Sequence, residues 1–221
     1  MKNTLIVVQC CKKKGDIDLI PYEKFDMEEK IPQTISILHE AINKFSQEGF
    51  IDTSSKPITA LSRYHGHFYT VPGLKNRIYD EIKNGSTQFL IMSAGYGLVH
   101  PFQKIHRYEL KMSGSITRYW LNIGLQKALE EFIENGKYTR VYGFFSKTAG
   151  YKKIFNAVNW SRLKNVEEAG YFYLDEIRGA SKILKTLAKL MLKLLDDDFS
   201  KTPVFFNDAK VIFIQKIESG K

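Results

Sequence analysis

Short apolar runs alternate along the chain with segments whose apolar residues recur every three or four positions. The first run covers residues 4–9 (TLIVVQ), the second covers 89–92 (FLIM) and the third covers 140–145 (RVYGFF). Runs of this length, bounded by loop residues, are typical of buried β-strands. We therefore predict a strand in each of these three ranges.

The segments between these runs have the spacing of helices. Apolar side chains repeat at helical intervals from Ile35 to Phe45, and Gly49 closes that segment. Similar patterns predict helices over 74–84, over about 115–135 with Ser115 as the cap, near 151–158, and over about 181–195. Strands that alternate with helices indicate an α/β fold in which a mixed β-sheet is flanked by helices. Because no internal repeat or low-complexity linker is present, we predict one domain over residues 1–221.

Composition narrows the class of partner. Lys and Arg outnumber Asp and Glu by 33 to 24, and this net charge of +9 favours a polyanionic partner such as nucleic acid. A basic protein without such a partner would have the same count. No apolar run approaches the roughly 20 residues that span a bilayer, so we expect no membrane partner. Cys10 and Cys11 are adjacent, which disfavours a disulfide between them and indicates the reducing cytoplasm. The sequence leaves the oligomeric state open.

Four lysines form a stripe on the last predicted helix. They occur at positions 182, 185, 189 and 193, opposite an apolar face. This pattern is typical of the solvated face of a packed helix, and it would also suit a surface that follows nucleic-acid phosphates. We keep Lys182 and Lys185 as candidate phosphate ligands.

Two loops that follow apolar segments concentrate polar and aromatic residues. The loop after the first strand (QCCKKKGDID) offers Gln9 and three lysines that, with backbone amides, could hold a phosphate, although it could equally be a basic surface turn. The segment 63–69 (RYHGHFY) places a glycine between two histidines, so that backbone and rings could approach a planar ligand. The two histidines could instead bind a metal, but they lack Cys or carboxylate partners at a recognisable spacing. We therefore expect no metal and no cofactor.

A third loop covers residues 93–99 (SAGYGLV) and leads to His106, Arg107, Tyr108 and Glu109. The glycines around Tyr96 predict a tight turn that holds this aromatic ring at the edge of a cleft. Ser93 lacks the G-x-S-x-G surroundings of a nucleophile, so we expect it to anchor a ligand. Glu109 is the first candidate for a general base. Since clefts in open α/β sheets form beyond the carboxyl ends of strands, we expect the three loops to meet there.

These loops, in this order, resemble the YaaA family of peroxide-stress proteins. The family's Y-x-G-x-x-Y motif corresponds to residues 64–69 (YHGHFY), its S-x-x-Y-G-L-L-x-P turn to 93–101 (SAGYGLVHP), and its Y-R-L-x-M segment to 108–112 (YELKM). Residues 145–151 are similar to its S-x-x-Y element, and 178–181 (RGAS) are similar to the start of its last helix. The resemblance runs from about Pro57 to Leu195. It departs at Glu109 and Lys111, where the family has Arg and Glu, and the opening CCKKK loop is more similar to a second branch of relatives with S-C-x-x-K.

The resemblance implies a YaaA-like α/β fold that binds DNA in a cleft. Its wider relatives include anti-phage DNA glycosylases that act on glucosylated hydroxymethylcytosine. We therefore expect a DNA N-glycosylase that flips a modified base of phage DNA out of the duplex and leaves an abasic site. The alternatives are a non-enzymatic protein that shields DNA under oxidative stress and a nucleotide or nucleoside hydrolase that uses the same cleft on a small substrate.

The glycosylase hypothesis assigns three sets of residues. Glu109 and then Asp16 are the candidate catalytic carboxylates, since glycosidic hydrolysis requires a negative charge near the sugar. The candidate base-binding residues are Gln9, Tyr64, His65, Gly66, His67, Ser93, Tyr96, Gly97 and Tyr108, with the tyrosines expected to stack on the base. The candidate phosphate-binding residues are Lys12, Lys13, Lys14, Arg107, Lys182 and Lys185.

Overall fold

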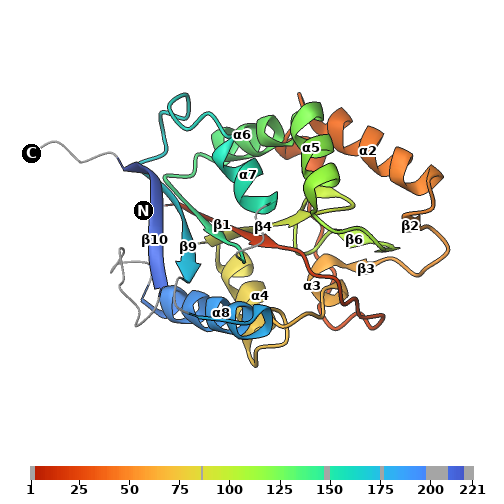
Figure 1. The fold of residues 1–221 in the computed structure, drawn as a ribbon, viewed down its shortest axis with the longest axis horizontal. Coiled ribbons are helices and arrows are strands. Elements are labelled where there is room, and N and C mark those ends of the chain that lie inside the picture. The colour runs from red at the N-terminus through yellow and green to blue at the C-terminus, as the bar shows by residue number, and fades with distance from the viewer. Residues whose placement is uncertain (1–2, 86, 147–149, 175–176, 198–208, 217–221) are drawn as a thin grey trace, which may run out of the picture.

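A β-sheet lies between two layers of helices in the computed structural model, which describes residues 3–85, 87–146, 150–174, 177–197 and 209–216 (Figure 1). The strand order across the sheet is β10-β9-β8-β1-β4-β5. Four strands run parallel, and the edge strands β5 and β10 are antiparallel to their neighbours. Their bounds are β1 (Thr4–Gln9), β4 (Thr87–Ser93), β5 (Gly97–Val99), β8 (Arg140–Phe144), β9 (Glu168–Leu174) and β10 (Ala209–Lys216). The prediction of a mixed sheet flanked by helices is confirmed.

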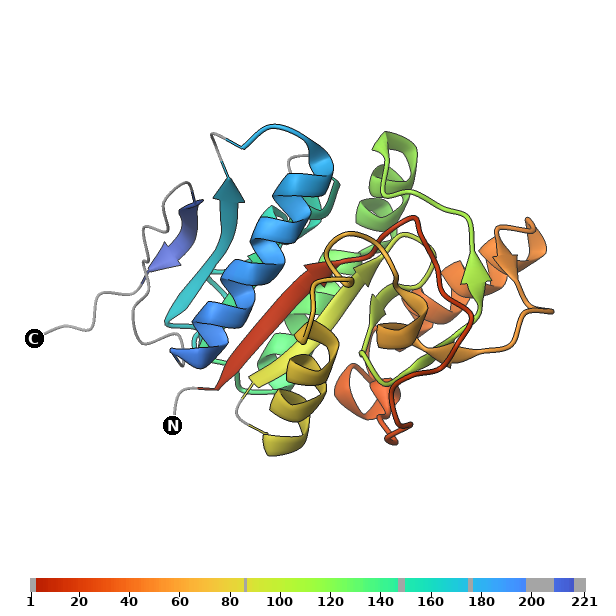
Figure 2. The ribbon, with the colours of Figure 1, turned by 90° about the horizontal axis from the view of Figure 1, so that it is seen from below.

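Helices cover both faces of this sheet. Two of them, α4 (Leu74–Asn84) and α8 (Ala180–Asp196), lie on one face and contact each other (Figures 1 and 2). The opposite layer contains α2 (Ile35–Gln47), α5 (Gly114–Ile123), α6 (Leu125–Asn135) and α7 (Gly150–Asn156). Every residue of β1 is buried, as its position between the two layers requires. No helix in the described part of the chain is long and apolar enough to cross a membrane.

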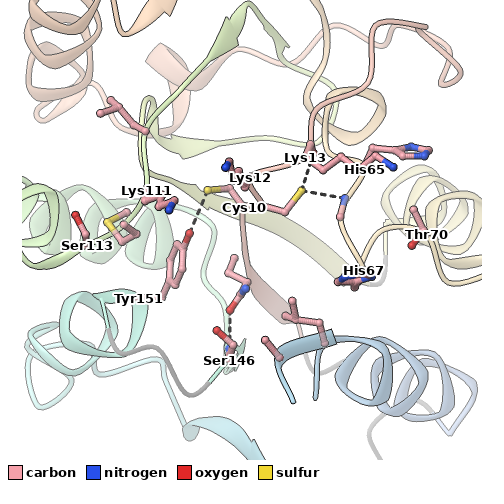
Figure 3. Close-up of a pocket in the computed structure, with 17 residues that line it drawn as sticks. Cys10, Lys12, Lys13, His65, His67, Thr70, Lys111, Ser113, Ser146 and Tyr151 are labelled. Atoms are coloured by element: carbon pink, nitrogen blue, oxygen red, sulfur yellow. Dashed lines mark hydrogen bonds between the residues drawn. The ribbon is translucent and has the colours of Figure 1, made fainter. Parts of the chain in front are cut away.

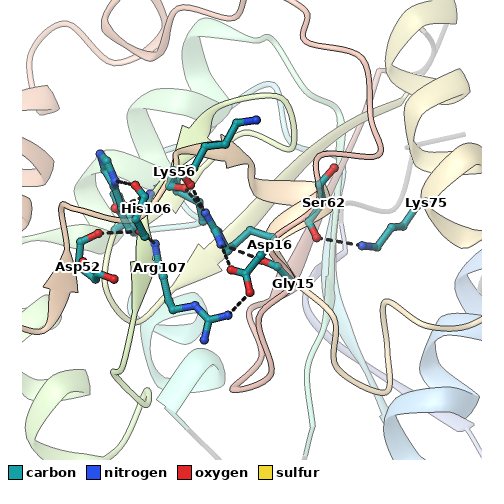
Figure 4. A network of polar contacts seen from close by, with 12 residues as sticks. Gly15, Asp16, Asp52, Lys56, Ser62, Lys75, His106 and Arg107 are labelled. Carbon is teal, nitrogen blue, oxygen red and sulfur yellow. Dashed lines mark hydrogen bonds and ion pairs between the residues drawn. The ribbon is translucent and has the colours of Figure 1, made fainter.

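Short elements complete the side of the molecule beyond β4 and β5. The two-stranded pairs are β2 (Ile51–Asp52) with β7 (Arg107–Tyr108), and β3 (Ile58–Thr59) with β6 (Lys104–Ile105). The remaining short helices are α1 (Met27–Lys30) and α3 (Ala60–Arg63). These elements bring the segments around residues 16, 56, 63 and 107 together, although they are far apart in the sequence (Figure 4).

The order of the parallel strands fixes where a ligand can bind. Taken in chain order, the first parallel strand, β1, has the second (β4) on one side and the third (β8) on the other. The chain thus reverses direction across the sheet between β1 and β8, and open α/β sheets bind ligands beyond the carboxyl ends of the strands at such a switch point. Val8 is paired with Phe144 there, so the residues that follow β1 and β8 emerge side by side.

The structure corrects the sequence-based elements in three places. The single helix predicted over 115–135 is two helices, α5 and α6, because Gly124 between them has φ +95°, a conformation that ends one helix. The N-cap of α5 is Ser113, not Ser115. Strands β9 and β10 were not predicted, whereas the strands over 4–9, 89–92 and 140–145 and the helix over 74–84 are confirmed, with small shifts of their ends.

Candidate ligand-binding site

The larger of two adjoining cavities has a volume of about 610 Å³ and opens at the switch point between β1 and β8 (Figure 3). The ends of both strands supply its floor, through Gln9, Cys10 and Ser146. The loop 65–67, the segment 110–113 and the first turn of α8 form its walls. Its lining residues are Gln9, Cys10, Cys11, Lys12, Lys13, His65, Gly66, His67, Thr70, Leu110, Lys111, Met112, Ser113, Ser146, Tyr151, Ala180 and Leu184.

Backbone hydrogen bonds hold two of the predicted loops against each other. The amide of His65 donates to the carbonyl of Lys13 at 3.0 Å, and the amide of Gly15 donates to the carbonyl of Arg63 at 2.7 Å. Gly66 allows the close approach, since a Cβ there would lie 2.6 Å from the Cβ of Cys11. The prediction that these two loops meet at one cleft is therefore confirmed, and glycine is required at position 66 for steric reasons.

Two cysteines and a tyrosine form part of the floor. The Sγ of Cys10 lies 3.1 Å from the hydroxyl of Tyr151, and the Sγ of Cys11 accepts a hydrogen bond from the Gly66 amide at 3.1 Å. Burial raises the pKa of Cys11 to about 11 and that of Tyr151 well above its ordinary value. The Cys11 thiol and the Tyr151 hydroxyl are therefore neutral near pH 7, and a thiol, unlike a thiolate, is a poor nucleophile.

The charged groups of the larger cavity are cationic. Lys12, Lys13 and Lys111 reach it from two different loops, and α8 begins at Ala180 in its wall (Figure 3). A helix N-terminus adds partial positive charge. None of the described residues that line the cavity is Asp or Glu. The cavity therefore suits a ligand that is rich in hydrogen-bond acceptors or carries negative charge.

The smaller cavity has a volume of about 440 Å³ and adjoins the larger one. It contains Glu109 together with Lys14 and Tyr108, and it shares part of its wall with the larger cavity. The shared wall consists of Lys12, Leu110, Lys111 and Ser113. These shared residues separate the lysines and thiols of the larger cavity from the carboxylate of Glu109 in the smaller one.

Lys14 does not extend into solvent. Its Nζ donates to the carbonyl of Cys11 at 2.6 Å and lies 4.0 Å from the centre of the Tyr108 ring. Burial lowers the pKa of Lys14 from its ordinary value. Nζ is thus bound to the loop that carries it, while Lys14 also lines the smaller cavity, so its assignment as a phosphate ligand stays a prediction.

Asp16, a predicted catalytic carboxylate, lies at neither cavity. Its carboxylate accepts a hydrogen bond from Arg63 at 2.9 Å and pairs through its other oxygen with Arg107 (Figure 4). The side chain of Arg63 is 1% exposed and also donates to the carbonyl of Gly15 at 2.7 Å. Asp16 and the two arginines therefore fasten the loop after β1, and Arg107, predicted to bind phosphate, has its guanidinium in this ion pair.

The three tyrosines predicted to stack on a base are buried. Tyr64, Tyr96 and Tyr108 are 0%, 6% and 1% exposed, and none lines the larger cavity. The Tyr64 and Tyr108 hydroxyls are 3.0 Å apart, and the Ser93 hydroxyl donates to that of Tyr108 at 3.1 Å. Ser93, Tyr64 and Tyr96 line neither cavity, so the prediction that they contact a ligand there is corrected. Tyr108 lines the smaller cavity, and its stacking role stays a prediction. Gly97, at the start of β5, lies outside both cavities.

Most of the other predicted residues do line one of the two cavities. Gln9, Lys12, Lys13, His65, Gly66 and His67 all line the larger cavity, as Glu109 lines the smaller one. Lys182 and Lys185 are exposed on α8 outside both cavities, the former two residues beyond Ala180. No group of three or more His, Cys, Asp or Glu side chains in the described ranges is arranged to hold a metal ion.

The sequence did not single out several lining residues as site residues. Cys10, Cys11, Lys111, Ser146 and Tyr151 are the chief examples. Ser146 could have been found from its position directly after the third apolar run, at the same edge of the sheet as Gln9. Residues 147–149, which belong to the S-x-x-Y resemblance, lie outside the described residues.

Fold and cavity together define an α/β protein with a ligand site at its topological switch point. The sequence matches no protein-family model and no curated protein. The function is therefore inferred from the geometry and charge of the two cavities.

Proposed function

We propose that this protein is a DNA N-glycosylase that excises a modified base, with the base in the larger cavity and Glu109 acting at the sugar. The shared wall of the two cavities supports this proposal most directly. A flipped nucleotide that crosses the wall near Lys12 and Lys111 would have its base on the lysine-rich side and its sugar facing Glu109. A volume of about 610 Å³ falls within the range of small-molecule sites, roughly 300–1,000 Å³.

The chemistry requires a flipped nucleotide, because stacked bases hide the glycosidic bond in a duplex. Water adds to the anomeric carbon while the bond from this carbon to the base nitrogen breaks, and the bonding electrons leave with the base. The Glu109 carboxylate takes a proton from the water and offsets the positive charge that develops on the sugar. An ammonium group of the shared wall, Lys12 or Lys111, donates the proton that the leaving base needs. The products are a free base and an abasic site.

The basic residues around the cavity fit the strand on either side of the flipped base. Lys13 lines the cavity, and the exposed lysines of α8, including Lys182 and Lys185, extend from the end of this helix that forms its wall. Each lysine that neutralises a phosphate releases a counterion and strengthens binding at low salt. A base enlarged by a sugar, such as glucosylated hydroxymethylcytosine in phage DNA, would make use of the volume of the cavity. Action on such DNA would give the protein a role in anti-phage defence.

The test is to incubate the protein with DNA that contains glucosylated hydroxymethylcytosine, hydroxymethylcytosine or cytosine. We expect alkali-labile sites and a released base, identified by mass spectrometry, with at least one modified DNA. Glu109→Gln should slow the release by about 100- to 10,000-fold. The control is Glu29→Gln, which changes an exposed carboxylate of α1 that lines neither cavity and should have full activity. Absence of release from every DNA, or full activity of Glu109→Gln, would contradict the proposal.

A second candidate function is DNA binding without catalysis, as in a protein that shields DNA under oxidative stress. The exposed lysines of α8 favour it, because they form a cationic surface that does not depend on either cavity. This function requires binding that weakens steeply with salt and yields no product. Lys185→Glu would then impair binding strongly, while Glu109→Gln would have no effect on any readout.

A further inference from the structure

Two large aliphatic side chains are exposed on the loop that follows β1. Ile17 is 72% exposed and Leu19 is 67% exposed, more than any other large hydrophobic side chain in the described part of the chain. We call these two residues the apolar ridge. Apolar surface in water is unfavourable, and neighbouring exposed aliphatic side chains mark a surface that a partner can cover.

Hydrogen bonds hold the backbone of the apolar ridge in place. The amides of Leu19 and Ile20 donate to the hydroxyl of the buried Ser62 at 2.9 and 3.0 Å. The carboxylate of Asp18, which lies between the two ridge residues in the sequence, accepts a hydrogen bond from the Thr59 hydroxyl at 2.6 Å. Because this backbone is already ordered, the ridge can contact a partner with little further loss of conformational entropy.

The apolar ridge lies close to the wall of the larger cavity. A Cβ at Gly15 would lie 3.8 Å from the Cβ of His65, and His65 lines that cavity. Ile17 follows Gly15 by two residues, and two residues of chain span at most about 7 Å. Successive bases of one DNA strand are about 3.4 Å apart along the duplex, so the ridge is within about three base steps of the cavity wall.

The charged side chains near the apolar ridge favour a polyanion as its partner. Lys12 and Lys13 precede the ridge in the same loop. After the ridge, the Nζ of Lys104 lies 4.7 Å from the centre of the Tyr22 ring. The carboxylate of Asp16 is paired with two arginines (Figure 4). An apolar ridge among cations fits duplex DNA, whose apolar base faces lie between two rows of phosphates.

We infer that Ile17 and Leu19 enter the base stack of duplex DNA and fill the space that a flipped nucleotide leaves. The inference rests on the proposed function and adds an interaction surface to it. Isoleucine and leucine are among the side chains that proteins insert between base steps to unstack DNA. Flipping breaks stacking and pairing, and apolar contact with the neighbouring bases offsets part of that loss. The ridge is therefore needed for a duplex and not for a single strand.

The first experiment measures how far the protein opens the base stack. A duplex contains glucosylated hydroxymethylcytosine with 2-aminopurine, a base whose fluorescence is quenched by stacking, as its neighbour. A 2′-fluoro sugar at the modified nucleotide disfavours positive charge on the sugar and keeps the base attached. At saturating protein concentration, we expect the wild type to raise the fluorescence several-fold and the double variant Ile17→Ala, Leu19→Ala to raise it much less.

The matched control is the double variant Ile17→Met, Leu19→Met, which keeps two long apolar side chains and should open the stack as the wild type does. Both positions are exposed, so both double variants should fold. With the ordinary sugar, the alanine variant should release the modified base about 10- to 100-fold more slowly from the duplex, and at nearly the wild-type rate from the same strand unpaired.

The inference alone is overturned if the wild type releases the base while the 2-aminopurine stays stacked, or if the alanine variant opens the stack as the wild type does. It is also overturned if analytical ultracentrifugation shows a wild-type dimer that the alanine variant converts to monomers, because the ridge would then bind a second copy of this chain. If the ridge opens the stack but no base is released from any DNA, the inference stands and the proposed function fails. If the wild type neither opens the stack nor releases a base, both fail.

Discussion

The larger and smaller cavities share a wall but present different chemistry to a ligand. The larger one is lined by lysines, histidines, hydroxyl groups and the neutral Cys11 thiol, and the described residues around it include no carboxylate. The smaller one holds Glu109 and the tethered Lys14. Lys12 and Lys111 line both cavities, so the carboxylate of Glu109 is the group that distinguishes the smaller one. Under the proposed function, the larger cavity would take the base and Glu109 would act at the sugar. The difference between the compartments can be tested residue by residue.

The largest effect is expected from the carboxylate of the smaller cavity. Glu109→Gln should lower the rate of base release by about 100- to 10,000-fold, the range typical of general acid–base catalysis, because the amide cannot take the proton of water. Its affinity for modified DNA should change little, since Glu109 does not line the larger cavity. Single-turnover kinetics and anisotropy measure the two quantities. A parallel loss of binding and rate would mean that the compartments do not divide the two tasks.

The next largest effect concerns the thiol of the larger cavity. Because burial raises the pKa of Cys11 to about 11, alkylation of Cys11 by iodoacetamide at pH 8 should be about 100-fold slower than that of a thiol with the ordinary pKa of 9.0. Peptide mapping by mass spectrometry gives the rate, with Cys11→Ser as the control for reaction at Cys10. If the alkylation rate of Cys11 levels off below pH 9, its pKa is not raised, and the floor of the larger cavity is more polar than the structure indicates.

The same raised pKa of Cys11 gives a dependence of stability on pH. Above pH 9 the unfolded chain loses the Cys11 proton while the folded protein keeps it until about pH 11. The folded state then binds more protons than the unfolded state, so the free energy of unfolding should fall as pH rises through this window. Denaturant titrations of the wild type and of Cys11→Ser at pH 8 and pH 10.5 isolate this contribution, which the variant should lack.

Two glycines allow a comparison of how closely the cavities are packed. Gly66→Ala would place a Cβ 2.6 Å from the Cβ of Cys11, whereas a Cβ at Gly114, next to the smaller cavity, meets no atom within 4 Å. Gly66→Ala should therefore lower the free energy of unfolding by about 1–3 kcal/mol, and Gly114→Ala should leave it nearly unchanged. Chemical denaturation measures both. Equal stability of the two variants would contradict the tight contact between the loops.

The smallest effect separates two neighbouring lysines. Lys13→Gln should weaken DNA binding several-fold and reduce the slope of log K against log salt by about 0.7–0.9, because Lys13 is free to approach a phosphate. Lys14→Gln should leave this slope unchanged, since its Nζ is bonded to the Cys11 carbonyl. Anisotropy between 50 and 200 mM salt gives the slopes. A reversed order of the two slopes would assign the phosphate contact to Lys14.

The apolar pattern was sufficient to predict three strands of the sheet and most helices, because burial on both faces demands continuous apolar runs. It did not predict β9, where Gly170 interrupts the apolar residues, or the helix break at Gly124. Site residues on loops directly after β1 were predicted, since strand ends mark clefts. The buried roles of Tyr64, Tyr108 and Asp16 were not, because the sequence does not show whether an aromatic or charged side chain points toward a ligand or toward a neighbour.

Gly124 has a consequence for anyone who would redesign the specificity of this protein. The break that it makes between α5 and α6 sets the direction of α5, and with it the position of Ser113, which belongs to both cavities. Gly124 itself lines neither cavity. A mutant library restricted to the residues that line the cavities would therefore omit a backbone position that shapes both cavities. A substitution that adds a β-carbon at residue 124 would alter the site without contacting a substrate.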